Sequence, residues 1–290
     1  MTIEAATVPD RLLASPVHHF GVTMSALATS PVIAPGQKVE TFRYWRMCAW
    51  AGPAFLFVFF VFWGLLGGNI PPIPADSPAT TLANHYRGNA NLIRIGLGVA
   101  MTFTVLYMIW GLTFTKVIER GIERGTDNNV LSTLQLWGAG LTVCPILISS
   151  SFWLTASYRP ESLDPSILQL YYDMPWLLIN LAYAVTTLQM CAMGVAFLKD
   201  KRETPLYPRW LSWFGIFVGV SFVLELLFPY FKAGPFARQG LINFWVEFFL
   251  WFFWIIFATV GVLKAIGRLE AEAALEQQTP GAQPVVGQSV

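Results

Sequence analysis

The sequence predicts an all-α protein that spans a membrane as a six-helix transmembrane bundle, with both termini cytoplasmic. Hydrophobic residues make up 55% of the 290-residue chain and charged residues only 12%, about half the charged fraction of an average soluble domain. The hydrophobic residues gather in six apolar runs, each long enough to cross a hydrocarbon core of about 30 Å. Most Lys and Arg residues fall on one side of the membrane that these runs define.

The first apolar run, Met47–Gly68, follows a basic and aromatic segment of the kind that lies at a membrane surface. Arg43 and Arg46 precede it, and a proline-rich segment ends it. Its centre, Phe55–Trp63, is apolar on every side and carries no polar chemistry. Residues 1–42 are rich in Pro, Ser, Thr and Ala, so we expect a flexible cytoplasmic tail without a signal peptide.

The second and third runs, Leu92–Phe114 and Val130–Ala156, each carry isolated polar residues. Before the second run, the segment Ser77–Asn89 is predicted to form a short interfacial helix of its own, with a serine N-cap. Arg94 lies close to the start of the second run. Pro145 lies in the middle of the third run and is expected to kink that helix.

The fourth run, Met174–Leu198, is predicted to begin at Asp173, because an acid followed by a proline suits the start of a helix. The segment Ser157–Tyr172 before it is predicted to be a connecting loop. Asn180 lies seven residues after Asp173, so the two side chains are expected to share a helix face.

The fifth and sixth runs, Trp210–Phe228 and Leu241–Ile266, form a hairpin around the loop Pro229–Gly240. The glycines and prolines of this loop permit sharp turns, and its aromatic residues suit the membrane surface, so we expect a compact loop. Residues 269–290 are predicted to be a cytoplasmic tail that begins as a short helical extension, which leaves residues 43–268 as the transmembrane domain.

The positions of Lys and Arg predict the orientation. One side collects thirteen of them: Arg11, Lys38, Arg43, Arg46, Lys116, Arg120, Arg124, Lys199, Lys201, Arg202, Arg209, Lys264 and Arg268. The other side has five: Arg87, Arg94, Arg159, Lys232 and Arg238. The positive-inside rule places the first group in the cytoplasm, together with both termini.

Two acids, Glu225 and Glu247, lie within the hairpin, each within about two helical turns of the outer loop. An acid inside a membrane-spanning helix is costly, about 2.5–3.5 kcal/mol for aspartate at the bilayer centre, so we expect both to face protein, water or a partner charge. The topology brings further polar residues to this depth. The candidate ligand-binding site or polar network consists of Arg94, Asp173, Asn180, Glu225, Asn243 and Glu247. At least one of the two glutamates is expected to contact a basic or amide side chain from Arg94, Asn180, Lys232, Arg238 or Asn243.

Two interpretations of these residues remain open. In the structural one, Arg94, Lys232 or Arg238 neutralises an acid and the network locks the helices together. In the functional one, the acids line an outward-open cavity that binds a substrate, a proton or a cation. The function is accordingly either transport or binding of a small molecule or ion, or a non-catalytic role as accessory subunit of a membrane complex.

Known catalytic and metal-binding patterns are absent from the sequence. Three histidines are too few for the histidine-rich site of a membrane di-iron hydroxylase or the paired ligands of an intramembrane b-type haem. There is no HExxH, Walker A or GxSxG motif, and none of the three cysteines has a CxxC partner. No catalytic residue, metal or cofactor is therefore assigned, and an enzyme is the third and least favoured hypothesis. The expected partners are the lipid bilayer, a small-molecule or ion ligand and, under the alternative, another membrane protein; no basic patch indicates nucleic acid.

Two segments, Tyr207–Trp213 and Phe231–Phe236, resemble elements of uncharacterised bacterial multi-helix integral membrane proteins. The resemblance extends mainly over Asn84–Ile266. It implies a multi-pass protein of the bacterial plasma membrane, the inner membrane, and it transfers no functional residue to this chain.

Overall fold

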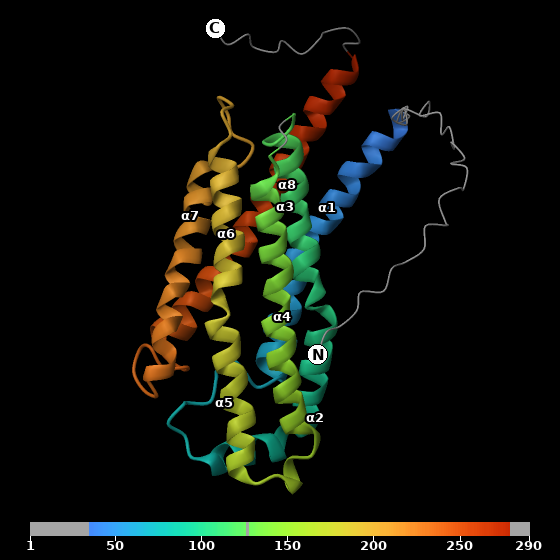
Figure 1. Ribbon diagram of the computed structural model, residues 1–290. Coiled ribbons are helices and arrows are strands. Elements are labelled where there is room, and N and C mark those ends of the chain that lie inside the picture. Colours follow the sequence, from blue (N-terminus) through green and yellow to red (C-terminus); the bar gives the residue numbers. More distant parts are fainter. Residues whose placement is uncertain (1–34, 126–127, 279–290) are drawn as a thin grey trace, which may run out of the picture.

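The computed structural model describes residues 35–125 and 128–278. Most of the predicted N-terminal tail, and the end of the C-terminal tail, lie outside these residues. Every regular element in the described chain is a helix, and six spans are long and apolar enough to cross a membrane (Figure 1), which confirms the predicted fold class. The spans are Phe42–Leu66, Ala79–Gly121, Val130–Tyr158, Pro165–Leu198, Arg209–Tyr230 and Leu241–Glu276.

Several spans are built from more than one helical element. The elements are α1 (Pro35–Val58), the π-helix η1 (Phe59–Leu66), α2 (Ala79–Phe103), α3 (Val105–Gly121), α4 (Val130–Tyr158), the 3-10 helix η2 (Pro160–Ser162), α5 (Pro165–Leu181), α6 (Tyr183–Leu198), α7 (Arg209–Ser221), the 3-10 helix η3 (Phe222–Tyr230), the π-helix η4 (Leu241–Val246) and α8 (Glu247–Gln278).

Two sequence predictions about helix boundaries are wrong. The segment Ser77–Asn89 is not a separate interfacial helix, because α2 runs without interruption from Ala79 to Phe103. Its buried side chains, including Leu82 and Tyr86, pack on the core and extend the helix below the membrane-length run. At 1.5 Å per residue, the 43 residues of the second span are about 65 Å long, roughly twice the hydrocarbon thickness.

The predicted loop Ser157–Tyr172 also contains helix, because α5 begins at Pro165. The carboxylate of Asp164 caps this helix by accepting hydrogen bonds from the hydroxyl (2.5 Å) and the backbone N–H (2.8 Å) of Ser166. These two hydrogen bonds hold the pKa of Asp164 below its ordinary value. Asp173 therefore lies inside α5 rather than at the start of a helix.

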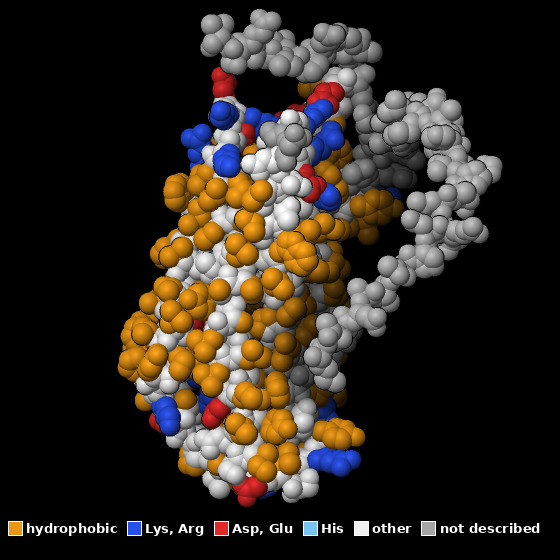
Figure 2. All heavy atoms as spheres, viewed as in Figure 1, with side chains coloured by type: hydrophobic (Ala, Val, Ile, Leu, Met, Phe, Trp, Pro, Cys, Tyr) orange, Lys and Arg blue, Asp and Glu red, His pale blue; other side chains and the backbone are white. Residues whose placement is uncertain are grey.

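The bundle has two distinct ends. At the upper end of Figure 1, α1 begins and α8 ends; at the lower end lie the loops 67–78 and 231–240. Between the two ends, hydrophobic side chains cover the visible surface, and Lys and Arg side chains gather most densely at the upper end (Figure 2). Helix α4 occupies a central position, since it packs against α2, α3, α5 and α6.

Glycine residues allow the helices of the bundle to approach closely, as is common between membrane helices. A Cβ atom added to Gly138 of α4 would lie 2.7 Å from the backbone nitrogen of Gln189 of α6. A Cβ atom added to Gly111 of α3 would lie 2.4 Å from the Cβ of Ala139. The backbones of α3, α4 and α6 are therefore nearly in contact at mid-bundle.

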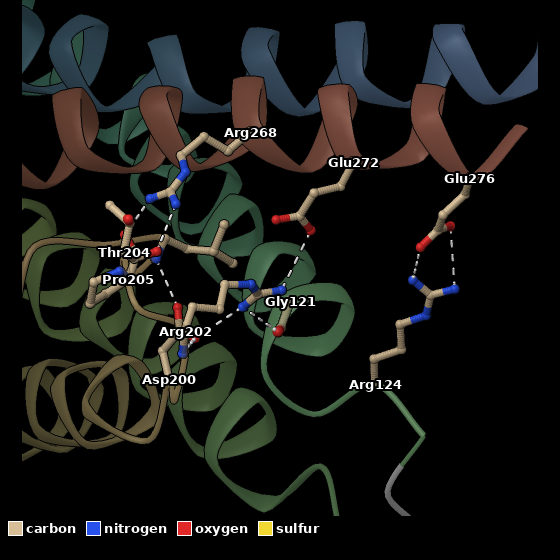
Figure 3. Close-up of polar contacts among 10 residues, drawn as sticks. Gly121, Arg124, Asp200, Arg202, Thr204, Pro205, Arg268, Glu272 and Glu276 are labelled. Atoms are coloured by element: carbon tan, nitrogen blue, oxygen red, sulfur yellow. Dashed lines mark hydrogen bonds and ion pairs between the residues drawn. The ribbon is translucent and has the colours of Figure 1, made fainter. Parts of the chain in front are cut away.

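Ion pairs at the upper end fasten the part of α8 that extends beyond the membrane-length run (Figure 3). They join it to α1, to the segment after α3 and to the loop after α6: Arg46–Glu270, Arg124–Glu276 (2.7 Å) and Arg202–Glu272 (3.5 Å). Arg268 of α8 adds hydrogen bonds to the backbone oxygens of Thr204 (2.6 Å) and Pro205 (2.5 Å). The helical extension predicted after the sixth run is thus present and anchored.

Candidate functional site

The loop between η3 and η4 is compact, as the sequence predicted, because backbone hydrogen bonds and side chains hold it. The backbone N–H groups of Ile242 and Asn243 both donate to the oxygen of Pro235. The guanidinium of Arg238, only 2% exposed, donates to Asp173 Oδ1 (2.6 Å) and to the backbone oxygen of Ile73 (2.9 Å). Arg238 therefore ties this loop to α5 and to the loop between the first two spans.

Arg94, another residue of the predicted network, binds oxygen atoms at the end of α4 and in α2. Its guanidinium donates to the backbone oxygens of Ser157 (2.8 Å) and Tyr158 (3.0 Å), where α4 ends, and to Asn91 Oδ1 (3.0 Å). Capping the last carbonyls of a helix with a positive charge is a structural function. Arg94 thus joins α2 to the lower end of α4.

A cavity of about 120 Å³ lies inside the bundle, and it brings together four of the six residues in the predicted network. Asn180, Glu225, Asn243 and Glu247 line it, whereas Arg94 and Asp173 do not. Its walls come from η1, α4, α5, α6, η3, η4 and α8. A cavity of this size has room for several waters or a small organic molecule. We refer to it below as the acidic cavity.

Departures from regular α-helix gather around the acidic cavity. The π-helices η1 and η4, the 3-10 helix η3 and the break between α5 and α6 at Ala182 all contribute lining residues. Pro145, the proline inside α4, lines it as well. Irregular backbone at membrane depth is tolerated where it lines a cavity or is buried in protein, and π-helical segments occur frequently at functional sites.

Glu225 and Glu247 both line this cavity, and Glu247 is only 3% exposed. Both carboxyl oxygens of Glu247 and Oε2 of Glu225 are buried without a hydrogen-bond partner among the described residues. Two carboxyl groups in one cavity repel each other when both are ionised, and a proton or another cation relieves that repulsion. The pair is therefore a place inside the bundle that suits a proton or another cation.

Among the described residues, no hydrogen bond or ion pair joins these glutamates to the basic and amide side chains expected beside them, although Asn180 and Asn243 line the same cavity. In the described part of the chain, neither carboxyl group forms an ion pair or accepts a hydrogen bond from an N–H donor. Arg238, which was expected to approach them, pairs with Asp173 instead. Arg238 thus neutralises Asp173, as the structural interpretation expected of one acid, and no basic residue of the described chain neutralises the two glutamates.

Other polar groups on the cavity wall also lack partners within the described chain. Asn243 is 4% exposed, and neither its amide nitrogen nor its amide oxygen forms a hydrogen bond. The indole N–H of Trp63 is buried without an acceptor. Buried polar groups are hydrogen-bonded in the great majority of cases, so a cluster of exceptions indicates a place prepared for a ligand or for water.

Aromatic side chains form most of the remaining wall, and the sequence did not identify them as site residues. They include Phe59, Trp63, Trp176, Phe244, Phe248 and Trp251. From the sequence alone, Phe55–Trp63 of the first span is described only as apolar, and the aromatic residues of the sixth span are given no role. Their spacing could have identified some of them as site residues. Phe244, Phe248 and Trp251 recur at intervals of four and three residues, which places them on the same helix face as Glu247.

A column of buried polar contacts continues from the acidic cavity toward the upper end of the bundle. Thr142 and Thr186, which line the cavity, are 3.0 Å apart through their hydroxyl oxygens. The further bonds run from Tyr107 Oη to Gln189 Oε1 (2.7 Å), from Gln135 Nε2 to the Gly111 oxygen (3.1 Å) and from Thr115 Oγ1 to Gln135 Oε1 (2.6 Å). Polar groups therefore extend from the cavity through the middle of α3, α4 and α6.

Comparison of the chain with protein-family models, with curated proteins and with solved structures finds no match. Functional inference consequently depends on the acidic cavity and the residues that surround it.

Proposed function

We propose that this polytopic membrane protein binds a small molecule or ion in the acidic cavity and transports it across the membrane. The observation that carries the proposal is the pair Glu225–Glu247, which lines a cavity and has no basic partner in the described chain. Ionisable residues inside membrane spans are costly and mark substrate, ion or proton pathways by default.

The broken helices support transport over a purely structural role. Discontinuous helices near the bilayer midplane form the substrate sites of many transporters, because their freed backbone groups and irregular geometry serve ligand binding. Here η1, η3, η4 and the α5–α6 break meet at one cavity. The alternative, an accessory subunit, would be favoured by a dry and fully paired polar network, and the glutamate pair does not fit that description.

Labelling from each side of the membrane tests this proposal. In a chain whose cysteines Cys48, Cys144 and Cys191 are replaced by serine, Asn243→Cys places a thiol on the cavity wall and Val246→Cys places one on the exposed face of η4. A permanently charged methanethiosulfonate reagent reacts with thiols that water reaches. A transporter that alternates its access should expose Asn243→Cys in both right-side-out and inside-out vesicles, while Val246→Cys is spared.

The outcomes separate the parts of the proposal. Modification of Asn243→Cys from one side alone would contradict transport and would leave ligand binding as the function. Protection of this cysteine from both sides, or equal modification of Val246→Cys, would overturn the cavity as a ligand site.

A further inference from the structure

The chemistry of the cavity wall narrows the class of ligand. Among the described residues that line it, the charged or chargeable groups are Glu225, Glu247 and the phenol of Tyr183, and there is no Lys, Arg or His. An anion would find two acids and no positive charge, so anionic substrates are excluded by electrostatics.

Divalent metal ions fit poorly. Calcium requires six to eight oxygen ligands and magnesium a near-octahedral set. The described residues contain no group of three or more His, Cys, Asp and Glu side chains able to hold a metal ion. Two acids surrounded by indole and phenyl rings instead resemble the sites at which proteins bind ammonium groups, where ring faces attract the cation.

The size of the cavity suits a compact molecule. Its volume is about 120 Å³, somewhat below the roughly 150 Å³ of an engineered apolar cavity that binds benzene. A ligand of a few carbon atoms around one charged nitrogen would fill it, whereas a lipid or a nucleotide would not enter.

Resting on the function proposed above, we infer that the acidic cavity binds a small organic ammonium ion. Its positive charge faces the carboxyl pair Glu225–Glu247, and its carbon atoms lie against aromatic rings such as Trp63, Trp176 and Trp251. The unpartnered amide oxygen of Asn243 accepts a hydrogen bond where the ammonium group carries an N–H.

Protons compete with this ligand. With one of its two carboxyl groups ionised, the pair carries one negative charge, which the ammonium ion neutralises. At low pH the pair takes up a second proton and loses its charge, so each ammonium ion that binds must release one proton. Tyr183 of α6 is the other titratable side chain on the wall; the described lining residues of η1, α4, α5 and η4 add none. Binding therefore weakens as the pH falls.

Three probes of similar shape and different charge test the inference on the full chain in lipid nanodiscs. Isothermal titration calorimetry measures the binding of tetramethylammonium, of pivalate as the anion and of tert-butanol as the neutral molecule. We expect one saturable site for tetramethylammonium and at least about tenfold weaker binding of the other two. Between about pH 8 and about pH 5, the Kd for tetramethylammonium should rise toward tenfold per pH unit, the limit for one displaced proton.

The double variant Glu225→Gln/Glu247→Gln removes both carboxyl groups while keeping their size and should weaken tetramethylammonium binding at least about tenfold. Glu161→Gln, the same change at an exposed position of η2, is the matched control and should leave the Kd unchanged. The probe comparison and the pH series use the unaltered chain, so they test the inferred ligand class even if the double variant does not fold.

Equal binding of pivalate or tert-butanol, a Kd that does not change with pH, or no saturable binding of tetramethylammonium would overturn the inference. If the ammonium ion fails to bind while Asn243→Cys is labelled from both sides, the ligand class is wrong and the proposed transport function stands. If the labelling also fails, both are wrong.

Discussion

At the scale of single residues, two buried polar groups near the lower end have opposite surroundings. Arg238 is fully engaged, with Asp173 and the Ile73 oxygen as acceptors and the ring of Tyr172 at 4.7 Å beneath its guanidinium. Glu247, in the sixth span of the same hairpin, has no hydrogen-bond partner among the described residues and faces the acidic cavity together with Glu225. The first arrangement stabilises the fold, and the second leaves a site open to a ligand.

Arg238→Met should lower the stability of the protein in detergent. The variant leaves the Asp173 carboxylate without its cation and the Ile73 oxygen without its donor, so we expect the free energy of unfolding to fall by about 2 kcal/mol or more. The melting temperature, measured by circular dichroism, reports the change. Lys232→Met is the matched control, because Lys232 is exposed in the same loop. Equal melting temperatures for the two variants would show that Arg238 does not anchor the loop.

At the scale of helices, the sequence predicted the existence of the six spans because twenty-residue apolar runs have few alternatives to crossing a membrane. It failed at Ser77–Asn89 and at Ser157–Tyr172, where polar and apolar residues are mixed. In the first segment, burial of Leu82 in the core stabilises the helix, and in the second, the Asp164 cap stabilises the start of α5. The π and 3-10 segments were not predicted either, since nothing in the apolar composition of Phe59–Leu66 distinguishes a π-helix from an α-helix.

The candidate site could be predicted in part for a similar reason. The cost of an acid in a membrane identified Glu225 and Glu247, and helix periodicity paired Asn243 with Glu247. The structural role of Arg94 could not be predicted in this way. Its guanidinium donates to backbone oxygens where α4 ends. Every residue has a backbone oxygen, so the sequence does not indicate which of them will accept a hydrogen bond.

Gly138→Ala should disturb the packing of α4 on α6. The new methyl group would meet the backbone of Gln189 at 2.7–2.8 Å, and backbone atoms cannot move aside as a flexible side chain can. We expect a loss of about 1–3 kcal/mol of stability, seen as a lower melting temperature. Gly98→Ala in α2 is the control, because no atom lies within 4 Å of the added Cβ and alanine favours helix there. A Gly138→Ala variant as stable as Gly98→Ala would mean that the two helices are less tightly packed than described.

At the scale of the whole molecule, the even number of spans places the start of α1 and the end of α8 at the same end of the bundle. The ion pairs of α8 and the densest Lys and Arg side chains lie at this end too. The positive-inside rule predicts that this end faces the cytoplasm and that the compact loop after η3 faces outward.

Cysteine labelling in intact cells tests that orientation. In the cysteine-free chain, an impermeant maleimide should modify Ser162→Cys, in the exposed turn η2, and should spare Glu203→Cys, in the exposed loop after α6. Two further loop positions are not used as probes, because Ala237 is buried and Asp127 lies outside the described residues. Labelling of Glu203→Cys with protection of Ser162→Cys would invert the orientation.

The continuity of α8 gives the molecule a mechanical property. Glu247 begins this helix at the acidic cavity, and Glu276 pairs with Arg124 near its far end. An unbroken helix between them is a stiff rod of about 44 Å. A tilt of about 5° that widens the cavity would move the far end by about 4 Å, farther than the ion pairs there can stretch. A whole-helix tilt of α8 at the acidic cavity would therefore break these ion pairs, because one continuous helix connects the cavity wall to the charged end of the bundle.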